Sequence, residues 1–143
     1  MEADTIIETL IAQTQGTDVL SKFASIWTSD KFRIKHIAKR VASGEVVDEF
    51  DYAEKTFEVM ARADTMTLVD PVNQSLRVTG KIQIEIDGWV VLISEEGKIV
   101  TSYPAYPNLQ SFEKRHQENG DFVYEKQIDR KYRAILAQLF GNG

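Results

Sequence analysis

Residues 76–104 read LRVTGKIQIEIDGWVVLISEEGKIVTSYP, and this stretch decides the fold class. Apolar and polar residues alternate up to Ile86, which is the pattern of a strand with one buried face. Asp87-Gly88 follows, and this dipeptide is a strong signal for a two-residue hairpin turn. The next segment, WVVLIS at 89–94, is almost wholly apolar and therefore predicts a central strand.

The second half of this stretch predicts another hairpin. Glu96-Gly97 is a turn signal, and KIVTSY at 98–103 has the composition of a strand. Pro104 and Pro107 then end regular pairing, because proline cannot donate to a sheet. TMTLVD at 65–70 is a candidate preceding strand, so we expect an antiparallel meander of about four strands.

A two-residue turn at each hairpin fixes which side chains share a face. At Asp87-Gly88 it pairs Ile86 with Trp89, and at Glu96-Gly97 it pairs Ile93 with Val100. One face, expected to pack on helices, carries Ile82, Ile84, Ile86, Trp89, Val91 and Ile93. The other face carries Lys81, Gln83, Glu85, Val90, Leu92, Thr101 and Tyr103.

Helical periodicity surrounds the meander. The predicted helices cover residues 4–13, 17–27, 30–43, 49–63 and 126–140. The pattern at 108–117 is ambiguous, and a short helix is one interpretation of it. Thr17 is a candidate cap for the second helix, Ser29 or Asp30 can cap the third, and Gly44 can end it. The apolar stripe of the third helix is Ile34, Ile37, Ala38 and Val41.

These elements predict an α+β fold, with helices first, then the meander, then a C-terminal helix. We expect one domain over 1–143: a helical extension at 1–29, a core at 30–105 and a helical segment at 106–143. The expected buried residues are Ile34, Ile37, Phe57, Ile82, Ile84, Trp89, Val91, Ile93 and Leu136.

Composition narrows the functional classes. The chain lacks cysteine, which excludes disulfides and thiolate chemistry, and no apolar run approaches the length of a membrane span. The N-terminal stretch MEADTIIETL is acidic and unlike a signal peptide, so we expect a cytoplasmic protein that binds no membrane. The two histidines, His36 and His116, lie in no metal-binding motif, and nucleotide-binding glycine motifs are absent, so we expect neither metal nor cofactor.

The net charge is −5, but charged residues are unevenly distributed along the sequence. The stretch KFRIKHIAKR at 31–40 has five basic residues and no acid, whereas residues 45–58 carry six acids against one lysine. Solvated helix faces explain most such runs. On a helix, however, His36 and Arg40 lie one turn apart, so a proton-transfer group and a phosphate-binding guanidinium would be neighbours.

A second candidate set lies in the meander. Thr101 and Tyr103 belong to GKIVTSYP, on the strand predicted beside the central one, and their hydroxyls could hold a scissile phosphate. Threonine and tyrosine also favour strands for packing reasons alone. Glu85 is the carboxylate that the expected register places on the same face, and it is a candidate second proton-transfer group.

Taken in order, these motifs resemble the barnase–EndoU–colicin–RelE superfamily of ribonucleases, in its phage and polymorphic-toxin members. That pattern has a helix with His-Ile/Val-x-x-Arg, followed by a hairpin with Trp, a Gly-containing turn, Thr, an aromatic residue and Pro. The matching residues here are His36, Ile37, Arg40, Trp89, Val90, Gly97, Thr101, Tyr103 and Pro104.

The resemblance implies metal-independent cleavage of RNA, such as tRNA, by attack of a ribose 2′-OH to give a 2′,3′-cyclic phosphate. It makes His36 a general acid or base, Arg40 the phosphate-neutralising group, and Thr101 and Tyr103 the positioning groups. The RNA-binding residues would be Arg33, Lys35, Lys39 and Lys81. An immunity protein or a host protein is a further expected partner.

One alternative comes from another class of protein. In the family pattern the histidine helix continues to a second histidine, whereas here it continues as RVASGE. The net charge is also acidic, where many members of the family are basic. Both differences suit a protein that does not cleave RNA. Such a chain could be a protein-binding module, for example a phage-encoded inhibitor that presents the acidic surface of residues 45–58 to a host enzyme. Convergence of His36, Arg40 and Thr101 or Tyr103 in an open groove would favour the ribonuclease, whereas scattering of these residues, or a plugged groove, would favour the binding module.

Overall fold

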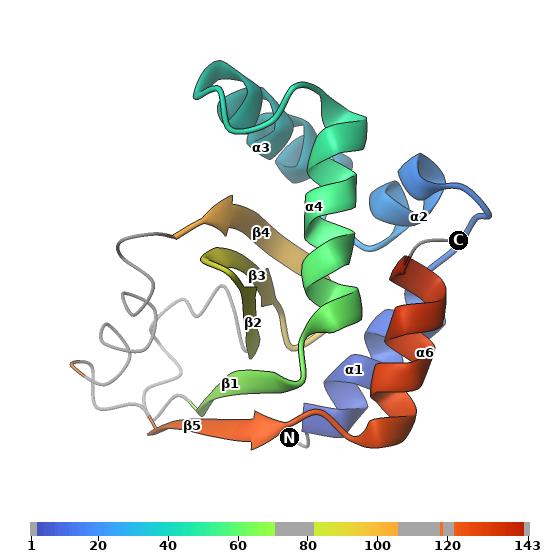
Figure 1. The fold of residues 1–143 in the computed structure, drawn as a ribbon, viewed down its shortest axis with the longest axis vertical. Coiled ribbons are helices and arrows are strands. Elements are labelled where there is room, and N and C mark those ends of the chain that lie inside the picture. Colours follow the sequence, from blue (N-terminus) through green and yellow to red (C-terminus); the bar gives the residue numbers. More distant parts are fainter. Residues whose placement is uncertain (1–2, 71–81, 106–117, 119–121, 142–143) are drawn as a thin grey trace.

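A five-stranded antiparallel sheet carries helices on one face and at one edge (Figure 1). The computed structural model describes residues 3–70, 82–105, 118 and 122–141. In these residues the helices are α1 (Ala3–Gln13), α2 (Val19–Ser25), α3 (Asp30–Ala42), α4 (Glu49–Arg62) and α6 (Arg130–Phe140). The strands are β1 (Thr65–Asp70), β2 (Ile82–Ile86), β3 (Trp89–Ile93), β4 (Ile99–Pro104) and β5 (Phe122–Gln127). The predicted α+β class is confirmed, with one strand more than expected.

The sheet order is β4-β3-β2-β1-β5, so the meander occupies one half. β5 pairs with β1 along its whole length, from Thr65 opposite Gln127 to Asp70 opposite Phe122. Residues 126 and 127, which helical periodicity assigned to the C-terminal helix, therefore belong to this strand. Their pairing with a strand some 60 residues earlier is a long-range contact that no local pattern encodes.

The first hairpin has the expected register. Ile86 lies opposite Trp89, Ile84 opposite Val91 and Ile82 opposite Ile93. Asp87 and Gly88 both have positive φ, at 51° and 86°, which is the geometry of a tight two-residue hairpin turn.

The second hairpin differs from the prediction. Its loop has three residues, because Ser94 N donates to Lys98 O at 2.8 Å, so Ile93 faces Ile99 rather than Val100. A β-bulge beside Ile93 then shifts the register again, and Leu92 lies opposite Thr101. The three-residue loop and the bulge each shift the pairing by one residue, and beyond the bulge the two shifts cancel. Thr101 therefore lies on the same face as predicted for a two-residue turn.

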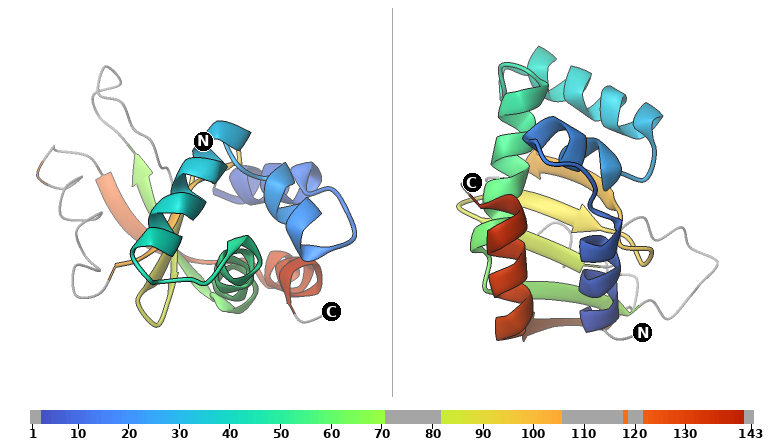
Figure 2. Two further views of the ribbon diagram at one scale, coloured as in Figure 1. Left: turned by 90° about the horizontal axis from the view of Figure 1, so that it is seen from above. Right: turned by 90° about the vertical axis from the view of Figure 1, so that its right-hand side faces the viewer.

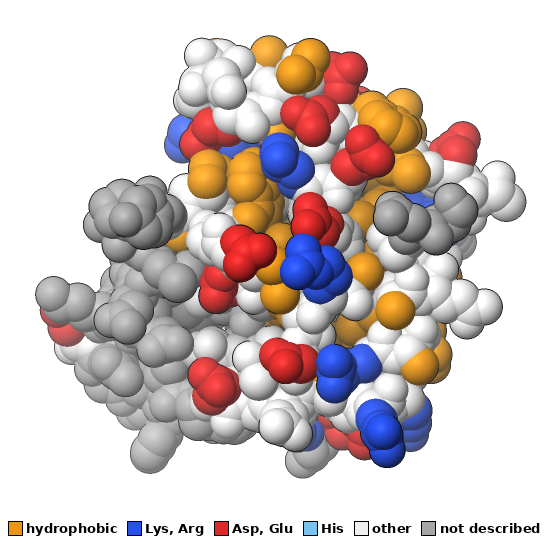
Figure 3. All heavy atoms as spheres, in the orientation of Figure 1, with side chains coloured by type: hydrophobic (Ala, Val, Ile, Leu, Met, Phe, Trp, Pro, Cys, Tyr) orange, Lys and Arg blue, Asp and Glu red, His pale blue; other side chains and the backbone are white. Residues whose placement is uncertain are grey.

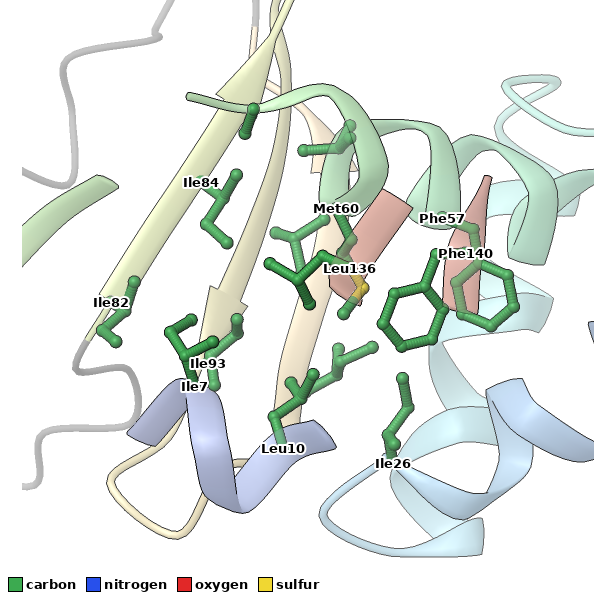
Figure 4. Packing of buried hydrophobic residues seen from close by; sticks show 14 of the residues in the cluster. Ile7, Leu10, Ile26, Phe57, Met60, Ile82, Ile84, Ile93, Leu136 and Phe140 are labelled. Carbon is green, nitrogen blue, oxygen red and sulfur yellow. The ribbon is translucent and has the colours of Figure 1, made fainter. Parts of the chain in front are cut away.

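The main core lies between the inner sheet face and α1, α2, α4 and α6 (Figures 2 and 4). All six inner-face residues predicted from the register belong to this cluster, with Ile86 and Trp89 only partly buried. Leu10 of α1 and Leu136 of α6 are also buried there, so the predicted N-terminal extension and C-terminal segment contribute to the same core.

Capping residues explain where the helices begin. Ser29 accepts a hydrogen bond from Phe32 N and caps α3, and Asp48 accepts one from Asp51 N and caps α4. Asp18, rather than the predicted Thr17, caps α2 by accepting from Ser21 N. The helix left open at 108–117 lies outside the described residues, as does Lys81.

Candidate functional site

The third helix, α3, lies past the β4 edge of the sheet (Figure 1), and its orientation is the largest departure from the prediction. Ile34 is 58% exposed and Val41 is 39% exposed, so the expected apolar stripe faces outward. The side that faces the protein carries Arg33, His36 and Arg40, with Ile37 packed against the core. The prediction that Ile34 is buried is wrong.

Neighbouring residues account for this rotation of α3. Trp27, which forms a parallel bridge with Ile99 at the edge of β4, stacks on His36 with 5.5 Å between ring centroids. Arg40 Nη1 lies 2.7 Å from Glu45 Oε1, and Arg33 Nε lies 3.7 Å from Glu49 Oε2. Aromatic stacking and two ion pairs, one with the loop between α3 and α4 and one with the first residue of α4, therefore replace the apolar packing that periodicity predicted.

His36 and Thr101 meet at the sheet edge. The Nδ1 atom of His36 lies 3.3 Å from Thr101 Oγ1, within hydrogen-bonding distance. The resemblance implied that His36 lies with the hydroxyls of this strand, and the hydroxyl that it contacts is that of Thr101. If Nδ1 carries the proton and donates to Thr101, the lone pair of Nε2 is free to accept another proton.

The surroundings of His36 lower the pKa of its imidazole below the ordinary 6.5. Partial burial is the largest cause, followed by the positive charges of Arg40, Lys39 and Lys35. Both effects disfavour the imidazolium, one through lost solvation and the other through repulsion. The histidine is therefore mostly neutral near pH 7, which is the form a general base needs.

The two arginines that flank His36 are partly neutralised but keep free donors. Their side chains are 14% exposed for Arg33 and 11% exposed for Arg40. In both, the buried Nε has no hydrogen-bond partner among the described residues, and the same holds for the indole Nε1 of Trp27. Arg33 Nε already faces the Glu49 carboxylate at 3.7 Å, so the donors left without a hydrogen bond or a facing charge are Arg40 Nε and Trp27 Nε1, and such buried donors are costly.

A buried network holds β4 from its inner side. The hydroxyl of Tyr52 donates to Ser102 O at 2.6 Å, and Ser102 Oγ lies 2.7 Å from Thr56 Oγ1. Trp89 Nε1 donates to the same Ser102 Oγ at 2.7 Å. Sequence reasoning missed Tyr52, Thr56 and Ser102, although a serine between Thr101 and Tyr103 on a core-facing position already required polar partners.

Side chains fill much of the outer face of the sheet beside His36. Val90 and Leu92 are buried there, and Tyr103 packs against their cluster. Gln83 is also buried, and its Oε1 lacks a hydrogen-bond partner in the described part of the chain. The accessible part of the site is therefore its edge, where α3 meets β4.

Glu85 does not join His36. Its Oε2 accepts a hydrogen bond from Gly88 N at 2.8 Å, which ties the carboxylate to the β2–β3 turn. β2 lies two strands from β4, a separation of roughly 10 Å across a sheet. The structure therefore assigns Glu85 to the hairpin turn.

The exposed lysines of α3 remain free. Lys31, Lys35 and Lys39 are exposed and form no ion pair with the residues that the structure describes. Within 3–70, 82–105, 118 and 122–141, no three acidic or histidine side chains are placed to hold a metal ion. No helix in these ranges is long and apolar enough to cross a membrane.

Comparison with known proteins gives one match. The model of a family described as "Uncharacterised protein aq_aa01" matches residues 17–141, which include α2 to α6 and all five strands. No curated protein and no solved structure matches the chain.

Proposed function

The chain belongs to the family of uncharacterised protein aq_aa01, and we propose that it is a metal-independent endoribonuclease with tRNA-like substrates. The contact between His36 Nδ1 and Thr101 Oγ1 at 3.3 Å carries this proposal. This contact brings together a neutral histidine, a hydroxyl group and nearby cationic side chains. Together these groups can bind and activate a phosphodiester. The sequence resemblance to the barnase–EndoU–colicin–RelE ribonucleases supports the same assignment.

The proposed reaction uses His36 as the base. Its Nε2 takes the proton of a ribose 2′-OH while the 2′-oxygen attacks the adjacent phosphorus. The bond from phosphorus to the 5′-oxygen breaks, and the products are a 2′,3′-cyclic phosphate and a 5′-hydroxyl. The proton held by His36 then passes to solvent, which balances the proton that the leaving oxygen acquires.

Other residues stabilise the phosphate and the leaving group in this scheme. Thr101 fixes the imidazole, and Arg40 places positive charge beside it. Tyr103, which follows on the same face of β4, can protonate the leaving 5′-oxygen, a role that water can also fill. The RNA backbone would follow the exposed Lys35 and Lys39 on α3.

The decisive experiment compares wild-type protein with His36→Ala on total tRNA, with and without EDTA, followed by end-group analysis. We expect wild type to leave 2′,3′-cyclic phosphates in EDTA, and His36→Ala to cleave about 10²–10⁴-fold more slowly. His116→Ala, which removes the chain's other histidine, is the matched control and should retain cleavage. Equal rates for wild type and His36→Ala in folded samples would contradict the proposal.

One observation favours the second candidate, a protein-binding module that presents an acidic surface. Val47 is 80% exposed and Phe50 is 45% exposed, beside the exposed acids Asp48 and Glu54. Apolar side chains among carboxylates suit a basic protein surface better than RNA. Failure of folded wild-type protein to cleave any tRNA would favour this candidate, with a host protein as the partner.

A further inference from the structure

The exposed apolar residues gather in one part of the molecule. Among the described residues, the exposed large apolar side chains that fall within residues 32–50 are Phe32, Ile34, Val41, Val47 and Phe50. Only two others occur, Leu20 and Ile135. Clusters of exposed apolar residues usually mark surfaces that bind other molecules, and neither the histidine nor its arginines explain this one.

The outer side of α3 has an ordered pattern, which we call the α3 outer face: Lys31, Ile34, Lys35, Ala38, Lys39 and Val41. All six residues are exposed, and α3 has no buried residue. Ile34, Ala38 and Val41 form an apolar stripe about 10 Å long, and the lysines line one flank of it. The result is an amphipathic helix surface that no residue in the described part of the chain covers.

A groove lies beside α4, on the face of the molecule that Figure 3 shows, where charged side chains of both signs lie among apolar ones. Its volume is about 660 Å³, and we call it the α4 groove. The apolar residues lining it are Val19, Phe50, Phe57, Ala61 and Phe140. From Phe50 to Ala61 the groove follows α4 for about 16 Å, which is longer than the two helical turns that the α3 stripe spans.

Charge at the groove complements charge on α3. Asp51, Glu54 and Glu58 line the groove, together with Lys55 and Arg62. Arg62 is paired with Glu58 at 2.7 Å, and Lys55 lies over the ring of Trp89. Glu54, exposed and without an ion pair among the described residues, is therefore the clearest counterpart for a lysine.

We propose that the chain self-associates, with the α3 outer face of one copy seated in the α4 groove of a second copy. The proposed function places RNA along Lys35 and Lys39, so RNA and a second copy would compete for this face. RNA accounts for these lysines but not for the apolar stripe. An anionic membrane would account for α3, yet it would repel the carboxylates of the groove. A second copy of this chain provides a partner for both surfaces, either reciprocally as a pair or in succession as a chain of molecules.

Paired charge reversals test the contact. Variant one is Lys31→Glu with Lys35→Glu, and variant two is Glu54→Lys with Glu58→Lys. Each reversed surface repels its normal counterpart in another copy of the same variant, so each variant alone should associate about tenfold or more weakly than wild type. An equal mixture should regain association, because each reversed surface then finds an oppositely charged partner.

Matched controls separate this effect from net charge. Arg130→Glu with Arg133→Glu changes charge as variant one does, and Glu95→Lys with Glu96→Lys changes it as variant two does. All four positions are exposed and lie outside both surfaces. These controls should associate like wild type, whereas Ile34→Gln should weaken association without altering net charge.

The measurement is sedimentation velocity from about 1 to 100 μM, with folding checked by circular dichroism. Wild type should sediment as more than a monomer at the upper concentrations, where protein complexes of micromolar affinity assemble. A wild-type protein that stays monomeric throughout would overturn the proposal. A mixture of the two variants that stays monomeric while wild type associates would overturn the α3–groove contact.

Discussion

The imidazole of His36 is subject to two influences that act in the same direction. Partial burial and the nearby positive charges of Arg40, Lys39 and Lys35 all lower its pKa. A lone basic helix face would give only the second effect. Because α3 turns this side chain toward Trp27 and Thr101, burial becomes the larger cause.

Titration of His36 by NMR checks this account. The pKa of His36 should lie below 6.5, and Lys39→Gln should raise it because a repelling charge is removed. Arg133→Gln, an exposed change on α6, should leave the pKa unaltered. A value at or above 6.5 in the folded wild type would contradict the placement of His36.

The same pKa shift has a consequence for stability. Because the folded-state pKa of His36 lies below the unfolded value, the unfolded chain binds more protons as the pH falls past about 6.5. The free energy of unfolding should therefore fall as pH decreases from there toward the folded-state pKa. His36→Gln should reduce this dependence in urea titrations at successive pH values.

The buried hydroxyl of Tyr52 offers a test of the Ser102 network. Tyr52→Phe removes the donor to Ser102 O and leaves that carbonyl without its side-chain partner, at a cost of about 1–3 kcal/mol. Tyr103→Phe is the matched control, since that half-buried phenol makes no hydrogen bond with the described residues. Urea denaturation should show the larger loss for Tyr52→Phe, and equal losses would argue against the network.

Among the elements, the β3–β4 hairpin depends on close packing against α1. Gly97 has φ of +74°, and a Cβ there would lie 2.8 Å from the backbone N of Leu10. Gln13 of the same helix donates to Glu96 O at 2.7 Å. The three-residue loop that moves the register by one residue is thus fixed by α1 as well as by its own turn residues.

Two glycine substitutions separate backbone strain from this packing. Gly44, past the end of α3, has φ of +72° with open space around it, so Gly44→Ala should cost only about 1–2 kcal/mol of backbone strain. Gly97→Ala should cost more, because overpacking against Leu10 adds about 1–3 kcal/mol. Thermal unfolding of both variants measures the difference, and equal losses would mean that α1 is not packed so closely.

At the scale of the whole molecule, one helix surface carries charge opposite in sign to the net charge of the protein. The chain carries −5 overall, yet Lys31, Lys35 and Lys39 are exposed along one helix. The neighbouring arginines are drawn inward and paired with Glu45 and Glu49. The acidic segment therefore neutralises the arginines while leaving the lysines for solvent or a partner.

The salt dependence of RNA binding tests whether those lysines act as proposed. Lys35→Ala with Lys39→Ala should weaken binding and reduce the log–log salt slope by about one unit per lost phosphate contact. Arg130→Ala with Arg133→Ala removes the same charge from α6 and should change the slope less. Binding with an unchanged slope in the lysine variant would exclude α3 as the RNA surface.

Local patterns determined much of this protein. Alternation and the Asp87-Gly88 dipeptide defined the first hairpin and its register, because a two-residue turn leaves a single pairing. The inner face of the sheet, the capping by Ser29 and the meeting of His36 with Thr101 were likewise predicted from sequence. The hairpin, the inner face and the cap depend on residue spacing or on turn chemistry, whereas the expectation for His36 and Thr101 came from the resemblance to the ribonuclease superfamily.

Tertiary contacts decided the rest. β5 became a strand because β1 offered it a paired edge, and Ile34 became exposed because aromatic stacking and ion pairs around His36, Arg33 and Arg40 set the rotation of α3. The bulge that leaves Thr101 opposite Leu92 depends on how β4 is held. These features depend on interactions between segments that are distant in the chain. Sequence periodicity reflects only the local preferences of each segment.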